Sequence, residues 1–162
     1  MARTLVVDHE RCCGCDYCVL ICSFSHGGVV RASGSRVRVY RHEDEALYVP
    51  VLCEHCEEPP CIPACPLEAI GRDAETGIVT IDGGRCTGCG ICLGSCPFSA
   101  IRMDPERGVA IACDACGGDP ACAKGCMADA IRWLEAEPPV RREKREHAER
   151  RRGALRRILE VR

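Results

Sequence analysis

The sequence predicts an α+β fold made of two pseudo-symmetric, cysteine-rich modules with short hairpins and helical turns, followed by a basic C-terminal helix. Three observations carry this prediction. The 162 residues include 17 cysteines, which fall into four compact groups and far exceed the content of ordinary domains. A short motif recurs at intervals of about 30 residues. Beyond residue 135 the chain contains no cysteine and is rich in arginine.

The cysteine groups are joined by segments that read as short strands. The sequence also predicts strands at 4–7, 36–41 and 47–52, the last two as partners. Residues 71–81 predict a hairpin that turns near residues 75–77, and residues 104–108 form the matching turn. The recurring motif is an Ala-Ile pair ending at Ile70, Ile101 and Ile131. Each repeat therefore consists of a cysteine loop, a helical turn around its last cysteine, and a strand.

The chain divides into residues 1–134, the cysteine-rich domain, and residues 135–162, an arginine-rich linker and helix. Residues 1–139 carry 12 Lys or Arg against 20 Asp or Glu, whereas residues 140–162 carry 10 against 4. The helix has a short apolar stripe at Leu155, Ile158 and Leu159. A solvated helix, a nucleic-acid contact and a protein contact are the three interpretations of this segment. The stripe and the acidic body favour docking on another subunit.

The cysteine spacing indicates iron–sulfur clusters. The first and third groups follow C-x2-C-x2-C-x3-C, in which three thiolates bind one 4Fe–4S cluster and the fourth binds its neighbour. The second and fourth groups widen one gap. Zinc ribbons are the alternative, but they use separated C-x2-C pairs. In chain order the groups are Cys12, Cys15, Cys18 and Cys22; Cys53, Cys56, Cys61 and Cys65; Cys86, Cys89, Cys92 and Cys96; and Cys113, Cys116, Cys122 and Cys126.

Two pairings of these groups are open. Proline follows the last cysteine of the second and third groups only, which favours pairing the second group with the third and the first with the fourth. Sequential pairing is the competing scheme. With exchanged fourth ligands, the favoured scheme gives four [4Fe–4S] clusters. Their ligands are Cys12, Cys15, Cys18 and Cys126; Cys22, Cys113, Cys116 and Cys122; Cys53, Cys56, Cys61 and Cys96; and Cys65, Cys86, Cys89 and Cys92.

The remaining reactive side chains predict no catalytic site. Cys13 lies outside the only complete quartet in its group and is interpreted as a spare thiol. The five histidines replace no cysteine in the pattern, and we expect them to be structural or solvent-facing. The sequence has neither a dinucleotide fingerprint nor a P-loop. We therefore expect a non-catalytic chain in which the clusters carry the chemistry.

Residues 1–134 resemble the four-cluster, polyferredoxin-type electron-transfer subunits of molybdenum and tungsten oxidoreductases and hydrogenases. The segments 18–28 and 113–122 resemble a narrower set, the small iron–sulfur subunits that accompany tungsten aldehyde:ferredoxin oxidoreductases. This resemblance implies a relay of single electrons between a tungsten–pterin catalytic subunit, which oxidises aldehydes, and a second redox partner such as a flavin subunit or a soluble ferredoxin. The rival function is a zinc-ribbon regulatory or nucleic-acid-binding protein. Head-to-tail self-association is a further expectation.

The N-terminus shows no export signal, and no apolar run approaches the length of a membrane span. We therefore expect a protein of the reducing cytoplasm, without a membrane span, in which structural disulfides are disfavoured.

Overall fold

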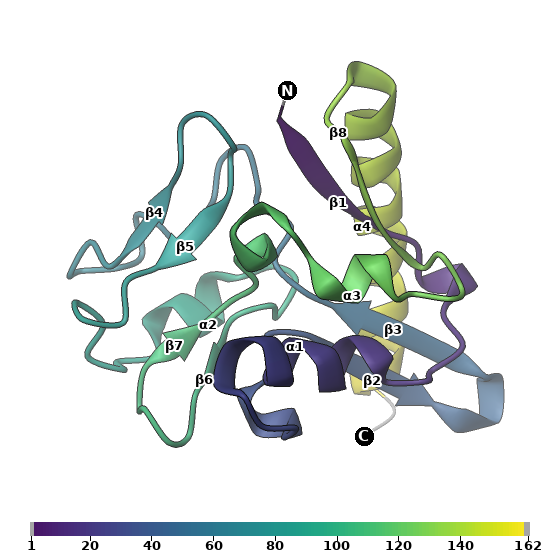
Figure 1. Cartoon of the computed structure of the whole chain (residues 1–162), viewed down its shortest axis with the longest axis horizontal. Helices are drawn as coiled ribbons and strands as arrows, with labels where there is room; N and C mark the ends of the chain where they lie inside the picture. Colours follow the sequence, from purple (N-terminus) through teal and green to yellow (C-terminus); the bar gives the residue numbers. More distant parts are fainter. Residues whose placement is uncertain (1, 161–162) are drawn as a thin grey trace.

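A computed structural model describes residues 2–160 (Figure 1). In this part of the chain the helices are α1 (Tyr17–Gly27), α2 (Ile91–Ser95), α3 (Ala121–Lys124) and α4 (Pro138–Glu160). Strands pair as small antiparallel sheets, and the α+β prediction is confirmed. The pairs are β1 (Arg3–Val7) with β8 (Ile131–Glu135), β2 (Arg38–His42) with β3 (Leu47–Val51), β4 (Ile70–Arg72) with β5 (Val79–Ile81), and β6 (Arg102–Met103) with β7 (Ala110–Ile111).

The pairing of β1 with β8 joins the two ends of the cysteine-rich domain. Val7 lies opposite Ile131, and Arg3 lies opposite Glu135. Figure 1 shows the two strands side by side, with α3 and α1 beneath them. Because the first cysteine group follows β1 and the fourth precedes β8, this sheet brings those two groups into one module.

The two predicted hairpins are confirmed and are built alike. In the β4–β5 turn, Asp73 Oδ1 accepts hydrogen bonds from the N–H and the hydroxyl of Thr76, both at 2.7 Å. In the β6–β7 turn, Asp104 Oδ1 accepts a hydrogen bond from the N–H of Glu106 at 3.0 Å. These side-chain contacts replace backbone pairing in the turn. The hairpins therefore give the second module its internal pseudo-symmetry.

Cysteines form part of two separate apolar cores. The first core packs Leu5, Val37 and Leu52 around cysteines of the first and fourth groups. The second packs Ile70 and Ile101 around cysteines of the second and third groups. Cys53 contacts both cores. The modules therefore adjoin at the start of the second cysteine group.

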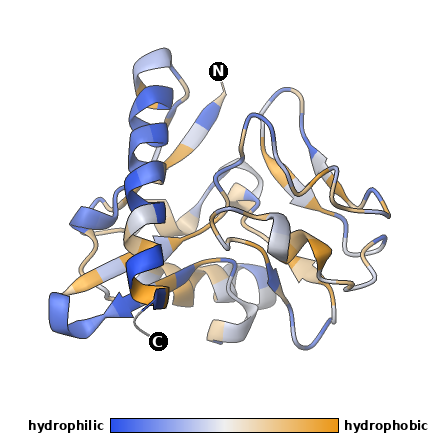
Figure 2. Ribbon diagram, turned by 180° about the vertical axis from the view of Figure 1, so that it is seen from behind, coloured by the Kyte–Doolittle hydropathy of each residue, from blue (hydrophilic) through white to orange (hydrophobic). Residues whose placement is uncertain are grey.

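Helix α4 packs on its own chain. Leu155 and Ile158 are 5% and 2% exposed and lie against Val49 and Val51 of β3. The expectation that this stripe covers another subunit is thus corrected; only Leu159, which is 45% exposed, remains open. The apolar face of β3 needs a cover, and a helix of the same chain supplies it without the entropy cost of association. Figure 2 shows the hydrophilic colouring over most of the helix.

A buried ion pair anchors α4 to the body. Arg151 is 2% exposed and pairs with Glu54, which is 7% exposed. The same guanidinium donates a hydrogen bond to the carbonyl oxygen of Val7 at 2.9 Å. The attraction between basic helix and acidic body therefore acts within one chain. No helix among residues 2–160 is long and apolar enough to cross a membrane.

We expect Ile158→Ala to lower the free energy of unfolding by about 2–5 kcal/mol, because it leaves a cavity beneath α4. The matched control is Leu159→Ala, one residue away, which removes a side chain that is 45% exposed and should cost little. Thermal unfolding of both variants measures the difference. Equal losses would contradict the packing of α4 described above.

Candidate metal centre

The four cysteine loops share one backbone feature. The second residue after the first cysteine of each group has a left-handed conformation: φ is +71° at Gly14, +46° at His55, +74° at Gly88 and +52° at Ala115. A Cβ on Gly88 would lie 2.1 Å from the carbonyl oxygen of Gly108, so glycine is required there. His55 and Ala115 adopt the same conformation at a cost. Sequence reasoning missed them, because neither residue type signals it.

This left-handed turn aims backbone donors at the first cysteine of the loop. The N–H of His55 donates to Cys53 Sγ at 3.4 Å, and the N–H of Ala115 donates to Cys113 Sγ at 3.4 Å. These two hydrogen bonds stabilise a thiolate more than a thiol. Repetition of the turn in all four loops indicates one kind of ligand throughout.

A second left-handed position follows the last cysteine. Glu68, Ser99 and Asp129, each three residues after such a cysteine, have φ of +49°, +51° and +50°. The next N–H then donates to the sulfur, from Ala69 to Cys65 at 3.3 Å. Ala100 does the same to Cys96 at 3.4 Å. In two of the three Ala-Ile repeats the N–H of the buried alanine therefore contacts the last cysteine of its group.

The last cysteines of the second and third groups lie beside the loop of the other group. Burial raises the pKa of Cys53 to about 12, and the negative charges of Cys96, Cys56 and Cys61 add to this effect. Burial also raises the pKa of Cys92, and the charges of Cys86, Cys89 and Cys65 add to it. A cavity is lined by Cys65 together with the third loop.

The last cysteines of the first and fourth groups likewise lie beside the loop of the other group. Burial raises the pKa of Cys12, and the charge of Cys126 contributes. Burial raises the pKa of Cys122 to about 12, and the negative charge of Cys22 adds to this effect. A second cavity is lined by Cys126 together with the first loop and Cys13.

We refer to these neighbouring sets as quartets. Their members are, for quartet I, Cys12, Cys15, Cys18 and Cys126; for quartet II, Cys22, Cys113, Cys116 and Cys122; for quartet III, Cys53, Cys56, Cys61 and Cys96; and for quartet IV, Cys65, Cys86, Cys89 and Cys92.

A family model described as a 4Fe-4S dicluster domain matches residues 44–136. The chain belongs to this dicluster family. The prediction of iron–sulfur clusters from the cysteine spacing is thereby confirmed.

Characterised relatives of this dicluster protein are subunits of oxidoreductases. The polyferredoxin-like subunit of an aliphatic sulfonate oxidoreductase from Pyrococcus furiosus is 34% identical over 75% of this chain and 70% of the relative. Thiosulfate reductase electron transfer subunit PhsB from Salmonella typhi is 37% identical over 78% of this chain and 72% of the relative. A tetrathionate reductase subunit from Salmonella typhimurium is 33% identical over 78% of this chain, which spans only 55% of that relative.

A solved structure has a similar fold. A chain of the active site complex BamBC of benzoyl coenzyme A reductase, in complex with 1,5 dienoyl-CoA, is 28% identical. The alignment covers 95% of the dicluster protein and 89% of that chain, with a TM-score of 0.50.

The residues present fit 4Fe–4S clusters. Burial raises the pKa of Cys18 to about 12 and that of Cys61 to about 11. Such crowded thiols ionise together only when a bound cation compensates their charge. No disulfide joins any of the 17 cysteines within residues 2–160, which leaves all of them free for metal. A bound cluster supplies one-electron redox chemistry, and the protein supplies thiolates and N–H donors.

A polar network that sequence reasoning missed supports Cys22. His26 Nε2 lies 3.0 Å from Asp114 Oδ1, and Arg36 pairs with the other carboxylate oxygen. The hydrogen bond with Asp114, and next that with Cys22, raises the pKa of His26 to about 10. Burial opposes ionisation of Cys22, but His26 and the N–H of Arg36 outweigh it and lower the pKa. His26 therefore contacts Cys22, one of the predicted cluster ligands.

Cysteines of different quartets also lie near one another. Cys113 of quartet II is buried, and the charge of Cys53 of quartet III helps to raise its pKa. After burial, the negative charge of Cys122 in quartet II contributes most to the raised pKa of Cys18 in quartet I. The exposed cysteines are Cys15 in quartet I, Cys89 in quartet IV, and Cys13 outside all four. Cys61 of quartet III and Cys92 of quartet IV belong to one core. The quartets therefore adjoin in the order I, II, III and IV, which we call the row, and its first and last members each contain an exposed cysteine.

Proposed function

We propose that the chain binds four [4Fe–4S] clusters, one in each quartet, and relays single electrons along the row from I to IV. The observation that carries this proposal is the exposure of Cys15 and Cys89 at the two ends, while the cysteines of quartets II and III are buried or half-buried. Electrons can enter or leave a protein only where a centre lies near the surface. Two exposed ends suit a relay between two partners.

One partner in this proposal is the catalytic subunit of an oxidoreductase complex, since the relatives are named as subunits of such enzymes. We assign it to the tungsten–pterin aldehyde oxidoreductase class, in the reducing cytoplasm. The support is the resemblance of segments 18–28 and 113–122 to the small subunits of that class. The other partner is a flavin subunit, a soluble ferredoxin or a second copy of the chain docked end to end.

Iron analysis of anaerobically purified protein tests the cluster count. We expect about sixteen iron atoms per chain and a brown protein with broad visible absorbance. Cys13→Ser serves as the control that separates a spare thiol from a ligand, and it should retain all of the iron. A loss of about four iron atoms from this variant would show that Cys13 belongs to a quartet. A colourless protein with bound zinc would exclude the relay altogether.

The partner is tested by anaerobic co-purification from the native organism. We expect a complex that contains tungsten and transfers electrons from an aldehyde to the clusters. Elemental analysis distinguishes tungsten from molybdenum. A complex without either metal, or one inactive on aldehydes, would contradict the assignment of the catalytic partner while leaving the relay intact.

A further inference from the structure

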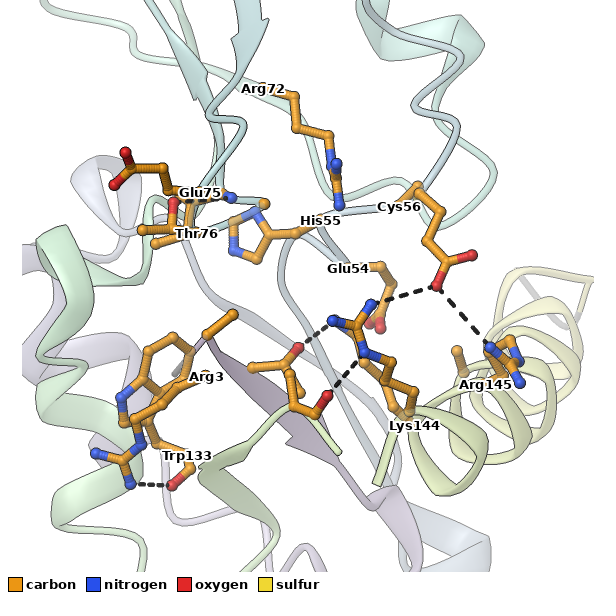
Figure 3. A pocket seen from close by; sticks show the side chains of 18 of the residues that line it. Arg3, Glu54, His55, Cys56, Arg72, Glu75, Thr76, Trp133, Lys144 and Arg145 are labelled. Carbon is orange, nitrogen blue, oxygen red and sulfur yellow. Dashed lines mark hydrogen bonds and ion pairs between the residues drawn. The ribbon is translucent and has the colours of Figure 1, made fainter. Parts of the chain in front are cut away.

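A pocket of about 490 Å³ lies where α4 and the β1–β8 sheet face the β4–β5 turn (Figure 3). Its size is within the range of small-molecule sites. Its walls combine aromatic groups, Trp133 and Phe98, with charged side chains from three parts of the chain. Cys56 of quartet III lines it as well, so a pocket ligand would lie beside the electron path.

Positive charge predominates in the pocket, and part of it is unpaired. Glu54 is already bound by Arg151 outside the pocket, and Glu57 lies 3.7 Å from Arg141. Among residues 2–160, no carboxylate lies within ion-pair distance of Arg72 or Lys144. Lys144 Nζ donates only to the hydroxyl of Thr4, at 2.7 Å. Two cations therefore face this space without a carboxylate partner.

His55 adds a third donor. Its Nδ1 accepts a hydrogen bond from the N–H of Val79 at 3.0 Å. An accepting Nδ1 has a free lone pair, so in the neutral ring the proton is on Nε2. Nε2 is buried and has no hydrogen-bond partner in the described part of the chain. A buried N–H donor without a partner is costly unless a ligand occupies the site.

We propose that this pocket binds the carboxylate or phosphate group of a small anionic molecule through His55 Nε2–H, Arg72 and Lys144. Trp133 and Phe98 provide an apolar wall for the remainder of the ligand. A guanidinium and an ammonium together suit an oxyanion, which accepts several charge-assisted hydrogen bonds at once. The binding site rests on these side chains alone.

A second part of this inference rests on the proposed function. An anion bound by Lys144 and Arg72 would neutralise cations next to Cys56, and net charge near a cluster sets its reduction potential. Occupancy should therefore lower the potential of the cluster in quartet III. The pocket would then couple a metabolite to the flow of electrons through the middle of the row.

Calorimetric titration of the anaerobic, iron-loaded chain with inorganic phosphate, and separately with acetate, tests the site. We expect one saturable site for at least one probe, weakened about tenfold or more in both Arg72→Gln and Lys144→Met. Arg142→Gln is the matched control, because Arg142 is exposed on α4 and does not line the pocket. It should leave binding unchanged.

The two probes distinguish a phosphate ligand from a carboxylate ligand. Absence of saturable binding for both, or equal binding in all three variants, would overturn the proposal. A redox titration with and without the bound probe tests the coupling, and an unchanged potential would overturn that part. Failure of the relay itself would appear independently, as missing iron in the unmodified protein.

Discussion

The Cys65→Ala variant is expected to lose about four of its sixteen iron atoms, and the lost cluster is the one in quartet IV. Cys65 follows the second loop in the sequence, but it lines a cavity with the cysteines of the third loop. The hydrogen bond from the N–H of Ala69 fixes its sulfur in that direction. The variant therefore removes a ligand from the neighbouring loop and leaves quartet III complete.

Double variants identify the cluster that is lost. Cys65→Ala combined with Cys89→Ala removes two ligands of one quartet, so its iron content should equal that of either single variant. Cys65→Ala combined with Cys56→Ala damages quartets IV and III and should lose about eight iron atoms. The reverse result would place Cys65 on the cluster of its own loop and would contradict the exchange of fourth ligands.

Arg151→Met is expected to destabilise the protein by about 3–5 kcal/mol, because it leaves the buried carboxylate of Glu54 without its partner. The temperature at which the visible absorbance of the clusters disappears should fall by roughly 6–20 °C. Arg152→Met is the control, since Arg152 is the next residue of α4 and is exposed.

The double variant Arg151→Met with Glu54→Gln removes both charges, and it should recover part of the loss. If Arg151→Met and Arg152→Met melt at the same temperature, the ion pair with Glu54 contributes nothing measurable to the attachment of α4.

Local features of this protein were predictable from the sequence. The cysteine loops and the two hairpins depend on residues that are close in the chain, such as Asp73 with Thr76. The pairing of β1 with β8 was not predicted, because Val7 and Ile131 are distant and nothing in either strand specifies its partner. The left-handed residues His55 and Ala115 were missed for a related reason, since their conformation is imposed by the loop around them.

The helix α4 was predicted, but its contact was not. An apolar stripe on a basic helix indicates that the stripe is covered by other protein residues. The stripe alone does not show whether those residues belong to the same chain or to another subunit. The buried pair of Arg151 and Glu54 decides the matter, and the two residues are far apart in the sequence. A charged residue within an arginine-rich segment gives no sign in the sequence that it will be buried.

The sheet formed by β1 and β8 also has a consequence for the order in which the protein matures. The cysteines of quartets III and IV all lie between Cys53 and Cys96, whereas quartet I joins Cys12 to Cys126. Closing a longer loop costs more entropy and slows folding. During synthesis the inner pair of metal centres can therefore assemble first, on a chain whose outer module is still open. In the proposed ligand scheme the outer pair requires β8 to have been synthesised and to have paired with β1, so we expect complete iron loading only of a chain whose whole cysteine-rich domain has been made.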